Sequence, residues 1–584
     1  MDSEKISNRE RIIRYGIIVL SIIGLMICTA VLFPQVRHKI MDFAEQILNK
    51  GILSKNSWIN TFFSYAMGGI FFILLFDYLT LVKSGRVLAG DVKKEMKECL
   101  SEINFRSFLI PVLILLGIYL LGILTIIRAN FLYLDDTLRS VEGSRRWFGW
   151  SRYVSELSSI FVHGDPKLTE ISPLPQLLAI FILSVSSVLL VYIIGNRKIT
   201  IVRLLASIPL GLSPYFLECL AYKFDAPYMA LSILASIIPF LFIARKKAFF
   251  FISAVSLLIM CMTYQTSSGV YPMIAVILCF QNWNSHKKSN KEILSWLGMA
   301  ALAFCCVLLI FRLFLMNYVD PSESYTSTSI HPVSQMLSGI LINMKDYASV
   351  IYHDFGLIWK IGIALVCIFF IIKSVKLSSR GKALSFFISI SAIVISFILS
   401  YGIYILLSDP SIYPRTLFGF GIFLAILCIY VVSDYRKSAI VTVLALNWCF
   451  LIFAFSYGNA LADQARYAEF RITMLLQDLS NLYPSRDGEM MSTQLKNTVG
   501  FAPSVKNISK HYPVIERLVP KRLGEEMNFD NYYYLIHFNV NKMRENIPLV
   551  TSIDFNTMDL PVVFDSYYHT IKSDGSHILI ILKH

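Results

Sequence analysis

Two adjacent acids follow an apolar run in the segment Asn130-Phe131-Leu132-Tyr133-Leu134-Asp135-Asp136. A carboxylate one or two turns beyond a membrane helix meets water and the head-group layer. There it can accept the proton of an attacking hydroxyl, which is general-base chemistry. The same side chains could instead cap a helix or stand as solvated loop acids. We predict Asp135 and Asp136 as the candidate catalytic bases.

Basic and aromatic side chains continue this segment. Guanidinium groups bind phosphate oxygens as a two-pronged fork, and exposed indole rings can stack on sugars. The alternative is an interfacial helix whose Trp and Arg side chains lie among lipid head groups. The candidates for substrate binding are Arg139, Glu142, Arg145, Arg146 and Trp147, with Trp150 and Arg152 further along the same loop.

Further charged residues lie near the ends of later apolar runs. Glu170 could face the same cleft, and Glu218 lies inside an apolar run, where an acid marks a functional site by default. Pairing of Glu218 with Lys223 is the alternative. Arg312 and Arg415 could hold a lipid phosphate or simply extend to the interface. The remaining candidates are Asp225, which would join the substrate-binding set, and Tyr264-Gln265, which could line a sugar pocket or cap a tight hairpin.

The composition is that of an integral membrane protein. Of the 584 residues, 55% are hydrophobic and 16% are charged, whereas soluble domains carry about 25% charged residues. A soluble enzyme, a disordered chain and a collagen-like rod are therefore excluded. Residues 457–584 hold 13 Lys and Arg against 14 Asp and Glu. The net charge of +14 thus lies in the membrane part, which fits topology signals and lipid head groups and predicts no nucleic-acid partner.

Cofactor motifs are missing from the sequence. The ten cysteines show no Cys-x-x-Cys or Cys/His spacing typical of zinc. There is also no Gly-rich nucleotide loop or Walker motif. We therefore predict no metal and no cofactor, and a transferase of this kind would take a lipid-carried donor rather than a soluble sugar nucleotide.

Thirteen apolar segments have the character of membrane-spanning helices, since open strands would leave backbone groups unpaired in lipid. Alternate segments hold 24 Lys and Arg residues, whereas the loops at 222–227, 264–269, 318–355 and 408–417 hold only three. This bias predicts a cytoplasmic N-terminus, and an odd number of spans puts the C-terminus outside. The predicted spans are 12–33, 58–82, 108–128, 175–195, 203–221, 228–244, 248–263, 269–281, 296–317, 356–377, 383–407, 418–433 and 438–456.

The chain divides at residue 457 in this interpretation. Residues 1–456 form the membrane domain, with outer loops at 129–174 and 318–355. Residues 457–584 form an outer domain that opens with a helix near 460–483 and continues with strands, including 532–538 and a hairpin around Asp574-Gly575. The predicted fold class is an all-α polytopic membrane protein of about thirteen transmembrane helices with a C-terminal α/β domain.

Several of these motifs together resemble a known family. The matching residues run from Asn130 through Asp135-Asp136, Arg139, Glu142-Gly143 and Arg146-Trp147, then Leu168-Thr169 with Ile171-Ser172-Pro173-Leu174-Pro175-Gln176, then Leu212-Ser213-Pro214-Tyr215-Phe216-Leu217-Glu218 and Phe224-Asp225. They resemble the Gtr-type (type II) glucosyltransferases of serotype-converting phages and enteric bacteria. The resemblance covers about residues 130–280, and Tyr413-Pro414-Arg415 and the outer C-terminal domain fit its general layout.

This resemblance implies a polytopic glycosyltransferase of the GT-C class in the bacterial inner membrane, with its C-terminal domain in the periplasm. Such an enzyme takes glucose from undecaprenyl phosphate-glucose and attaches it to a sugar of the lipopolysaccharide O-antigen repeat at the periplasmic face. Its partners are the donor, the O-antigen acceptor, the lipid bilayer, and the synthase and flippase that supply the donor. GT-C enzymes carry an essential acid in the first large outer loop, which here maps onto Asp135 and Asp136.

The expected reaction is a single displacement. Asp135 or Asp136 removes the proton of the acceptor hydroxyl, whose oxygen attacks the anomeric carbon while the polyprenyl phosphate leaves. Its charge would be met by Arg139, Arg145, Arg146, Arg312 or Arg415. The alternatives are an O-antigen polymerase, another GT-C transferase that uses a lipid-linked sugar, or a polysaccharide flippase. A flippase would show repeat symmetry and charged residues at mid-span, which this sequence lacks.

Overall fold

The computed structural model describes residues 83–316, 329–434, 436–483, 492–524, 537 and 555–584. The chain forms two compact units, residues 1–91 and 92–584. The predicted spans 12–33 and 58–82 lie outside the described residues, and so does the predicted strand 532–538 apart from His537. Everything below concerns the second unit.

Seven described helices are long and apolar enough to cross a membrane, which indicates membrane association. The fourth of them, α14, starts at a capping box in which Ser289 and Glu292 bond each other's backbone amides. The seven are α4 (Arg106–Ala129), α7 (Leu174–Ile194), α12 (Lys246–Thr263), α14 (Asn290–Ile310) continued by the π-turn η4 (Phe311–Leu315), α16 (Leu357–Lys376), α17 (Lys382–Leu399) and α19 (Lys437–Leu482).

Other apolar segments are broken or short. The segments Ile201–Leu212 and Pro214–Ala221 are bent by 60° and could form an eighth span. All eleven predicted spans after residue 83 coincide with a helix or a run of helices, but seven or eight have spanning length, so thirteen spans are not reached in the part of the chain described. The shorter helices are α8 (Ile201–Ala206), α9 (Pro209–Leu212), α10 (Pro214–Ala221), α11 (Ala226–Ile237) with η2 (Ile238–Phe242), α13 (Val270–Asn284) and α18 (Gly419–Val431).

Connecting helices lie between these elements. The segment after α4 forms α5 (Asp135–Glu142), η1 (Phe148–Trp150) and α6 (Tyr153–His163), within the predicted outer loop 129–174. The remaining helices are α3 (Lys83–Ser101), η3 (Gln265–Gly269), η5 (Val333–Gln335), α15 (Met336–Asp354), η6 (Gly402–Leu406), η7 (Pro414–Thr416), η8 (Val432–Asp434), α20 (Pro503–His511), α21 (Ile515–Leu518) and η12 (Phe555–Thr557).

A small mixed sheet lies near the C-terminus, with strand order β1-β4-β3-β2. Strands β3 and β4 form the predicted antiparallel hairpin, with Ile571 opposite Ile580, so that prediction is confirmed. Strand β1 adds to β4 in parallel, which requires a long connection between them. The strands are β1 (Ser492–Lys496), β2 (Val562–Asp565), β3 (His569–Ser573) and β4 (His577–Leu582).

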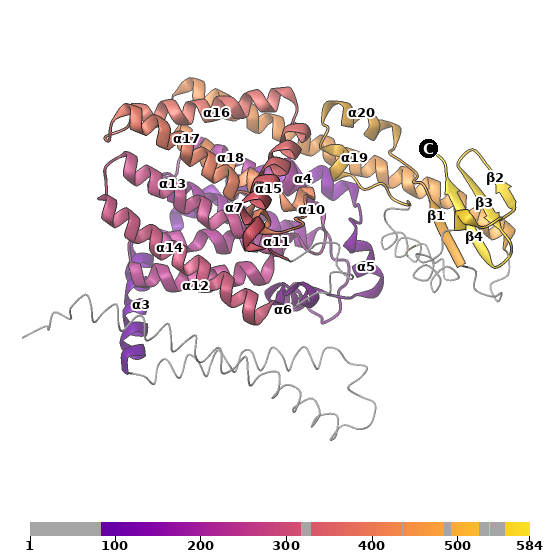
Figure 1. Cartoon of the computed structure of the whole chain (residues 1–584), viewed down its shortest axis with the longest axis horizontal. Helices are drawn as coiled ribbons and strands as arrows, with labels where there is room; N and C mark the ends of the chain where they lie inside the picture. Colours follow the sequence, from indigo (N-terminus) through magenta and orange to yellow (C-terminus); the bar gives the residue numbers. More distant parts are fainter. Residues whose placement is uncertain (1–82, 317–328, 435, 484–491, 525–536, 538–554) are drawn as a thin grey trace, which may run out of the picture. The chain divides into compact units, whose positions relative to one another are not determined.

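Helix α19 joins the membrane helices to this sheet (Figure 1). It is 46 residues long and continues without a break through the predicted boundary at residue 457. Its first half packs on α4, whereas Ala468, Ile472 and Leu475 of its second half form a core with Ile571 and Ile580 of the sheet. The polar residues after 460 therefore end the apolar character of α19 but not its helix.

Helices α4 and α19 approach closely at Gly458. A Cβ atom there would lie 2.5 Å from the carbonyl carbon of Thr125 and 2.6 Å from the amide nitrogen of Ile126. The Thr125 hydroxyl donates a hydrogen bond to the carbonyl oxygen of Ala454 at 3.2 Å. Small residues at such crossings let membrane helices approach closely enough for backbone contact.

We expect Gly458→Ala to destabilise the protein by about 1–3 kcal/mol, because the added methyl group must push α19 away from α4. Thermal unfolding of the detergent-purified protein measures the effect. The matched control is Gly117→Ala on α4, where a Cβ atom would meet no neighbour within 4 Å. Equal melting temperatures for both variants would contradict the close approach.

Candidate functional site

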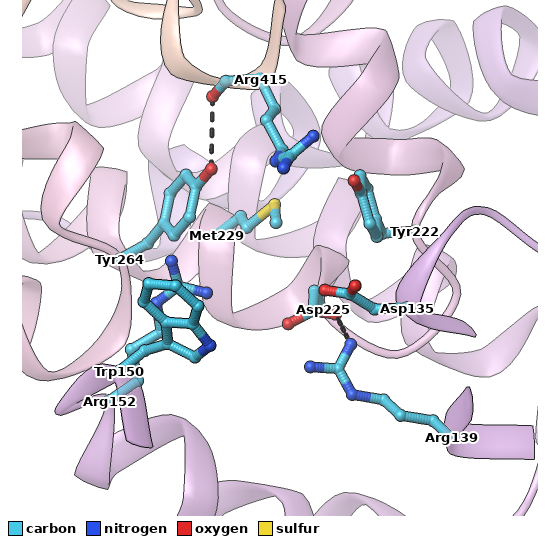
Figure 2. A pocket seen from close by; sticks show the side chains of 9 residues that line it. All are labelled: Asp135, Arg139, Trp150, Arg152, Tyr222, Asp225, Met229, Tyr264 and Arg415. Atoms are coloured by element: carbon cyan, nitrogen blue, oxygen red, sulfur yellow. Dashed lines mark hydrogen bonds and ion pairs between the residues drawn. The ribbon is translucent and has the colours of Figure 1, made fainter. Parts of the chain in front are cut away.

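One pocket collects side chains from loops that are far apart in the sequence (Figure 2). Its empty volume is about 370 Å³, part of it open to solvent. Three of the loops predicted to lie on the outer side, 129–174, 222–227 and 408–417, contribute to it, and Tyr264 is added by the loop at 264–269. The lining residues are Asp135, Arg139, Trp150, Arg152, Tyr222, Asp225, Met229, Tyr264 and Arg415.

A tight turn at Leu134 comes directly before the two adjacent acids, which start α5. Leu134 has a φ of 45°, a backbone conformation that residues with side chains rarely adopt. After this turn Asp135 is exposed and lines the pocket, whereas Asp136 is 0% exposed. Strained backbone of this kind often occurs at functional sites, where the surroundings hold it in place. The turn therefore gives neighbouring carboxylates opposite environments.

Asp136 is a buried hydrogen-bond acceptor. Its Oδ2 accepts the backbone amides of Tyr133 and Lys223, both at 3.0 Å, and its Oδ1 accepts the amide of Phe224 at 3.4 Å. Burial raises the pKa of the Asp136 carboxyl to about 7, an effect that the amide of Lys223 opposes. Asp136 thus fastens the start of α5 to the turn before α11.

Asp225 fastens the same two segments from the other side. Its Oδ2 pairs with the guanidinium group of Arg139, and its Oδ1 accepts the indole N–H of Trp147. The Arg139 guanidinium also lies 4.5 Å from the centroid of the Trp147 ring. All three side chains are buried. Arg139 and Trp147 are therefore engaged by the protein, although Arg139 still lines the pocket.

A second buried acid supports Trp147. The Oε2 of Glu156 accepts the backbone amides of Trp147 at 3.0 Å and Phe148 at 3.2 Å, and its Oε1 lies 3.1 Å from Nε of Arg145. Burial raises the pKa of Glu156, and Arg145 opposes the shift. This pair stiffens the loop that leads to Trp150 and Arg152.

Two arginines face the pocket from other segments. Arg415 lies 3.3 Å from Oε1 of Glu218, which also accepts the hydroxyl of Tyr133 at 3.2 Å. The Arg152 guanidinium stacks on the ring of Tyr264 at 4.7 Å, and the Tyr264 hydroxyl donates to the backbone oxygen of Arg415 at 3.4 Å. In Figure 2 the Asp135 and Asp225 carboxylates lie next to each other, and Arg415 and Arg152 approach them from two other directions.

Other predicted site residues are placed elsewhere. Glu142, the last residue of α5, pairs at 2.9 Å with Arg146 in the following loop. Glu170 pairs with Lys223, so Lys223 is not the partner of Glu218. Arg312 lies exposed in η4 beside Met316. None of these side chains, nor Arg145, lines the pocket, and their predicted substrate roles stay predictions.

Comparisons with known proteins identify the family of this chain. The model of the glucosyl transferase GtrII family matches residues 124–432, which hold every residue that lines the pocket. The chain belongs to the GtrII glucosyltransferase family. It is also similar to an uncharacterised 55.3 kDa protein from the gtrB 5′ region of Salmonella phage P22, with 23% identity over 438 residues, or 71% of this chain and 87% of the phage protein. No solved structure matches the chain.

Sequence reasoning did not select all of the residues that line this GtrII pocket. Trp150, Arg152 and Tyr264 were recognised as possible contacts, but Tyr222 and Met229 were missed. A signal for both existed, because Tyr222 lies between Glu218 and Asp225, and Met229 lies one helical turn after Asp225. Among the described residues no group of three or more His, Cys, Asp and Glu side chains could hold a metal ion.

Raising the pH should destabilise the protein through Asp136. Because burial raises its pKa from 3.8 to about 7, the folded protein keeps a proton that the unfolded chain releases between roughly pH 4 and 7. Stability therefore falls as the pH rises through this window. We expect Asp136→Asn to flatten the dependence of the melting temperature on pH between about 4 and 7, measured by thermal unfolding in detergent.

The exposed neighbour supplies the control for this titration. Asp135→Asn, which changes the exposed neighbouring acid and leaves Asp136 in place, is the matched variant for comparison. A slope that survives in Asp136→Asn would show that other groups cause the pH dependence.

Proposed function

We propose that this glucosyltransferase transfers glucose from undecaprenyl phosphate-glucose to a sugar of the O-antigen repeat, at the periplasmic face of the bacterial inner membrane. The N-terminus is cytoplasmic and the C-terminal region periplasmic in this proposal. A separate synthase and flippase supply the donor. One observation supports it above the others: a single pocket holds an exposed carboxylate, Asp135, together with two arginines, Arg152 from the end of the same loop and Arg415 from a distant segment.

The chemistry follows from this arrangement. Asp135 accepts the proton of the acceptor hydroxyl, and the hydroxyl oxygen forms a bond to the anomeric carbon of glucose. The bond from that carbon to the phosphate oxygen breaks, and the electron pair leaves with the polyprenyl phosphate. Arg415 and Arg152 stabilise the phosphate as its charge grows. One displacement inverts the configuration of the anomeric carbon.

Asp135 is a better base than Asp136 in this mechanism. A general base must come within hydrogen-bond reach of the proton that it removes. Asp135 is exposed and lines the pocket, whereas the oxygens of Asp136 are occupied by backbone amides. We therefore assign Asp136 a structural role and Asp135 the catalytic role.

Linkage analysis of the O-polysaccharide tests the transfer directly. Cells that express this protein together with the donor synthase and flippase should add a glucose branch to each repeat, and cells without it should lack the branch. An unchanged glucose content with an altered chain length would instead identify a polymerase. An added sugar other than glucose would correct the donor.

Substitution of Asp135 tests the mechanism. We expect Asp135→Asn to lower the transfer rate by roughly 10²–10⁴-fold, the usual contribution of a general base, while membrane insertion and abundance stay normal. The rate is measured with radiolabelled lipid donor and purified acceptor. Asp165→Asn is the matched control, since Asp165 is an exposed acid of the same loop. Full activity of Asp135→Asn would remove the catalytic assignment.

A further inference from the structure

A distal part of the chain packs into the membrane unit. The segment 503–522, called the C-terminal brace below, contains α20 and α21. Its buried side chains belong to the same hydrophobic core as the helices α4 to α19, and Gln464 of α19 bonds the backbone of Gly500 and Ala502 just before it, at 3.0 and 2.9 Å. The buried members are Val505, Val514, Ile515, Leu518 and Val519.

The brace contacts the acidic side of the pocket through its last residues. Arg522 is 2% exposed, its Nη1 lies 3.1 Å from Oγ1 of Thr137, and its guanidinium lies 4.9 Å from the centroid of the Phe131 ring. The hydroxyl of Tyr133 donates to the backbone oxygen of Leu518 at 2.6 Å. These contacts reach residues on both sides of Asp135.

The brace also contacts the basic side. Arg517 pairs with Asp354 at the end of α15, and it donates to the backbone oxygen of Ile412, three residues before Arg415. Asp354 in turn accepts the hydroxyl of Tyr215 of α10 at 2.8 Å. One short segment thus holds the loop of the proposed base and the loop of the phosphate-binding arginine.

Packing alone does not account for these arginines. The guanidinium group of Arg522 is buried, which is costly unless its donors are satisfied, so an apolar side chain would fill the same space at lower cost; Arg517 is partly exposed. Arg522 instead presents its donors to α5, and Arg517 presents its donors to the 412–415 loop. These hydrogen bonds depend on direction, so they can fix the positions of α5 and of the 412–415 loop. Apolar packing does not require such directed contacts.

We infer that the C-terminal brace is a positioning element of the active site. Arg522 fixes the turn that carries Asp135, and Arg517 fixes the loop that carries Arg415. Neither side chain lines the pocket, so both act through other residues. The inference rests on the proposed roles of Asp135 and Arg415, and the first experiment below is chosen to be independent of them.

The first experiment measures the position of the loop without measuring transfer. In an Asp135→Cys protein, the rate of labelling by a membrane-impermeant maleimide reports how accessible position 135 is. The protein that retains Asp135 gives the background labelling of the native cysteines. Adding Arg522→Met should raise the labelling rate several-fold, because the turn loses its anchor. Adding Lys506→Met should leave it unchanged, since Lys506 is exposed on α20 of the same brace. Equal labelling in Arg522→Met would overturn the inference, whatever the role of Asp135.

Kinetics with Asp135 intact then separate the two sides. Arg522→Lys and Thr137→Val should each lower kcat by roughly 10–100-fold, the cost of a misplaced reacting group, with the KM for the lipid donor unchanged. The double variant should be no slower than the slower single variant, because both changes remove one contact. Arg517→Lys should raise the KM for the donor as well as lower kcat, because Arg415, which contacts the phosphate in the bound donor and in the transition state, loses its position.

The alternatives give different results. If Arg522 substitutions raise the KM for the acceptor and leave kcat unchanged, the segment binds the acceptor chain and the positioning role is wrong. If Arg522→Met fails to insert, Arg522→Lys and Thr137→Val decide the question, since both keep the size of the side chain. If Asp135→Asn is fully active while labelling responds to Arg522, the catalytic assignment fails and the anchoring stands.

Discussion

A carboxylate removed from water must be surrounded by hydrogen-bond donors, and the site depends on how two acids meet this need. Asp136, at the start of α5, takes backbone amides from Lys223 and Phe224. Asp225, which directly follows Phe224, accepts hydrogen bonds from the side chains of Arg139 in α5 and Trp147 in the loop after α5. Each of the two segments therefore contributes a buried acid that accepts hydrogen bonds from the other segment. Neither arrangement is stable alone, because removing one partner leaves a buried charge unpaired.

This reciprocal contact explains why adjacent acids have different chemistry. The turn at Leu134 leads into the first turn of α5, where Asp135 is exposed to water and Asp136 faces inward. The inward acid, Asp136, holds the turn by accepting the amide of Tyr133. The outward acid, Asp135, is then presented from a fixed backbone while its own oxygens remain accessible. An Asp-Asp pair on a flexible loop would offer two solvated carboxylates and no defined geometry for proton transfer.

Much of this arrangement could be predicted from the sequence. The charge bias and the alternation of spans along the chain group the loops at 129–174, 222–227, 264–269 and 408–417 on one side, and all lining residues of the pocket except Met229 come from these loops. The Asp574-Gly575 hairpin and the helical nature of the apolar runs were also predictable, because turn chemistry and hydropathy are local properties. The number of spans was not, since an apolar run such as Gly419–Val431 can be buried among other helices without crossing the membrane on its own.

Pairings between distant residues could not be predicted. Glu218 has Lys223 five residues away, yet it pairs with Arg415, because α10 ends at Ala221 and the chain turns Lys223 toward Glu170. The predicted boundary between the membrane domain and the outer domain at residue 457 likewise rests on a change of hydropathy along the chain. Helix α19 tolerates that change, since a helix needs an apolar stripe only where a neighbour covers it. In both cases the deciding contact comes from a part of the chain that local patterns do not report.

The proposed transfer uses arginine side chains whose positions are already fixed in the folded protein. As the bond to phosphate breaks, negative charge grows on the phosphate and positive charge on the sugar. Arg415 is fixed by Glu218 and by the rings of Tyr222 and Tyr413, and Arg152 is fixed by Tyr264. Charges that need no rearrangement stabilise a transition state more than mobile ones, because the protein has met the cost of orienting them during folding. The three most buried arginine–carboxylate pairs in the described part of the chain, Arg139–Asp225, Arg145–Glu156 and Arg415–Glu218, hold residues of this pocket or of the loop that leads to it, where their orientation has a chemical effect.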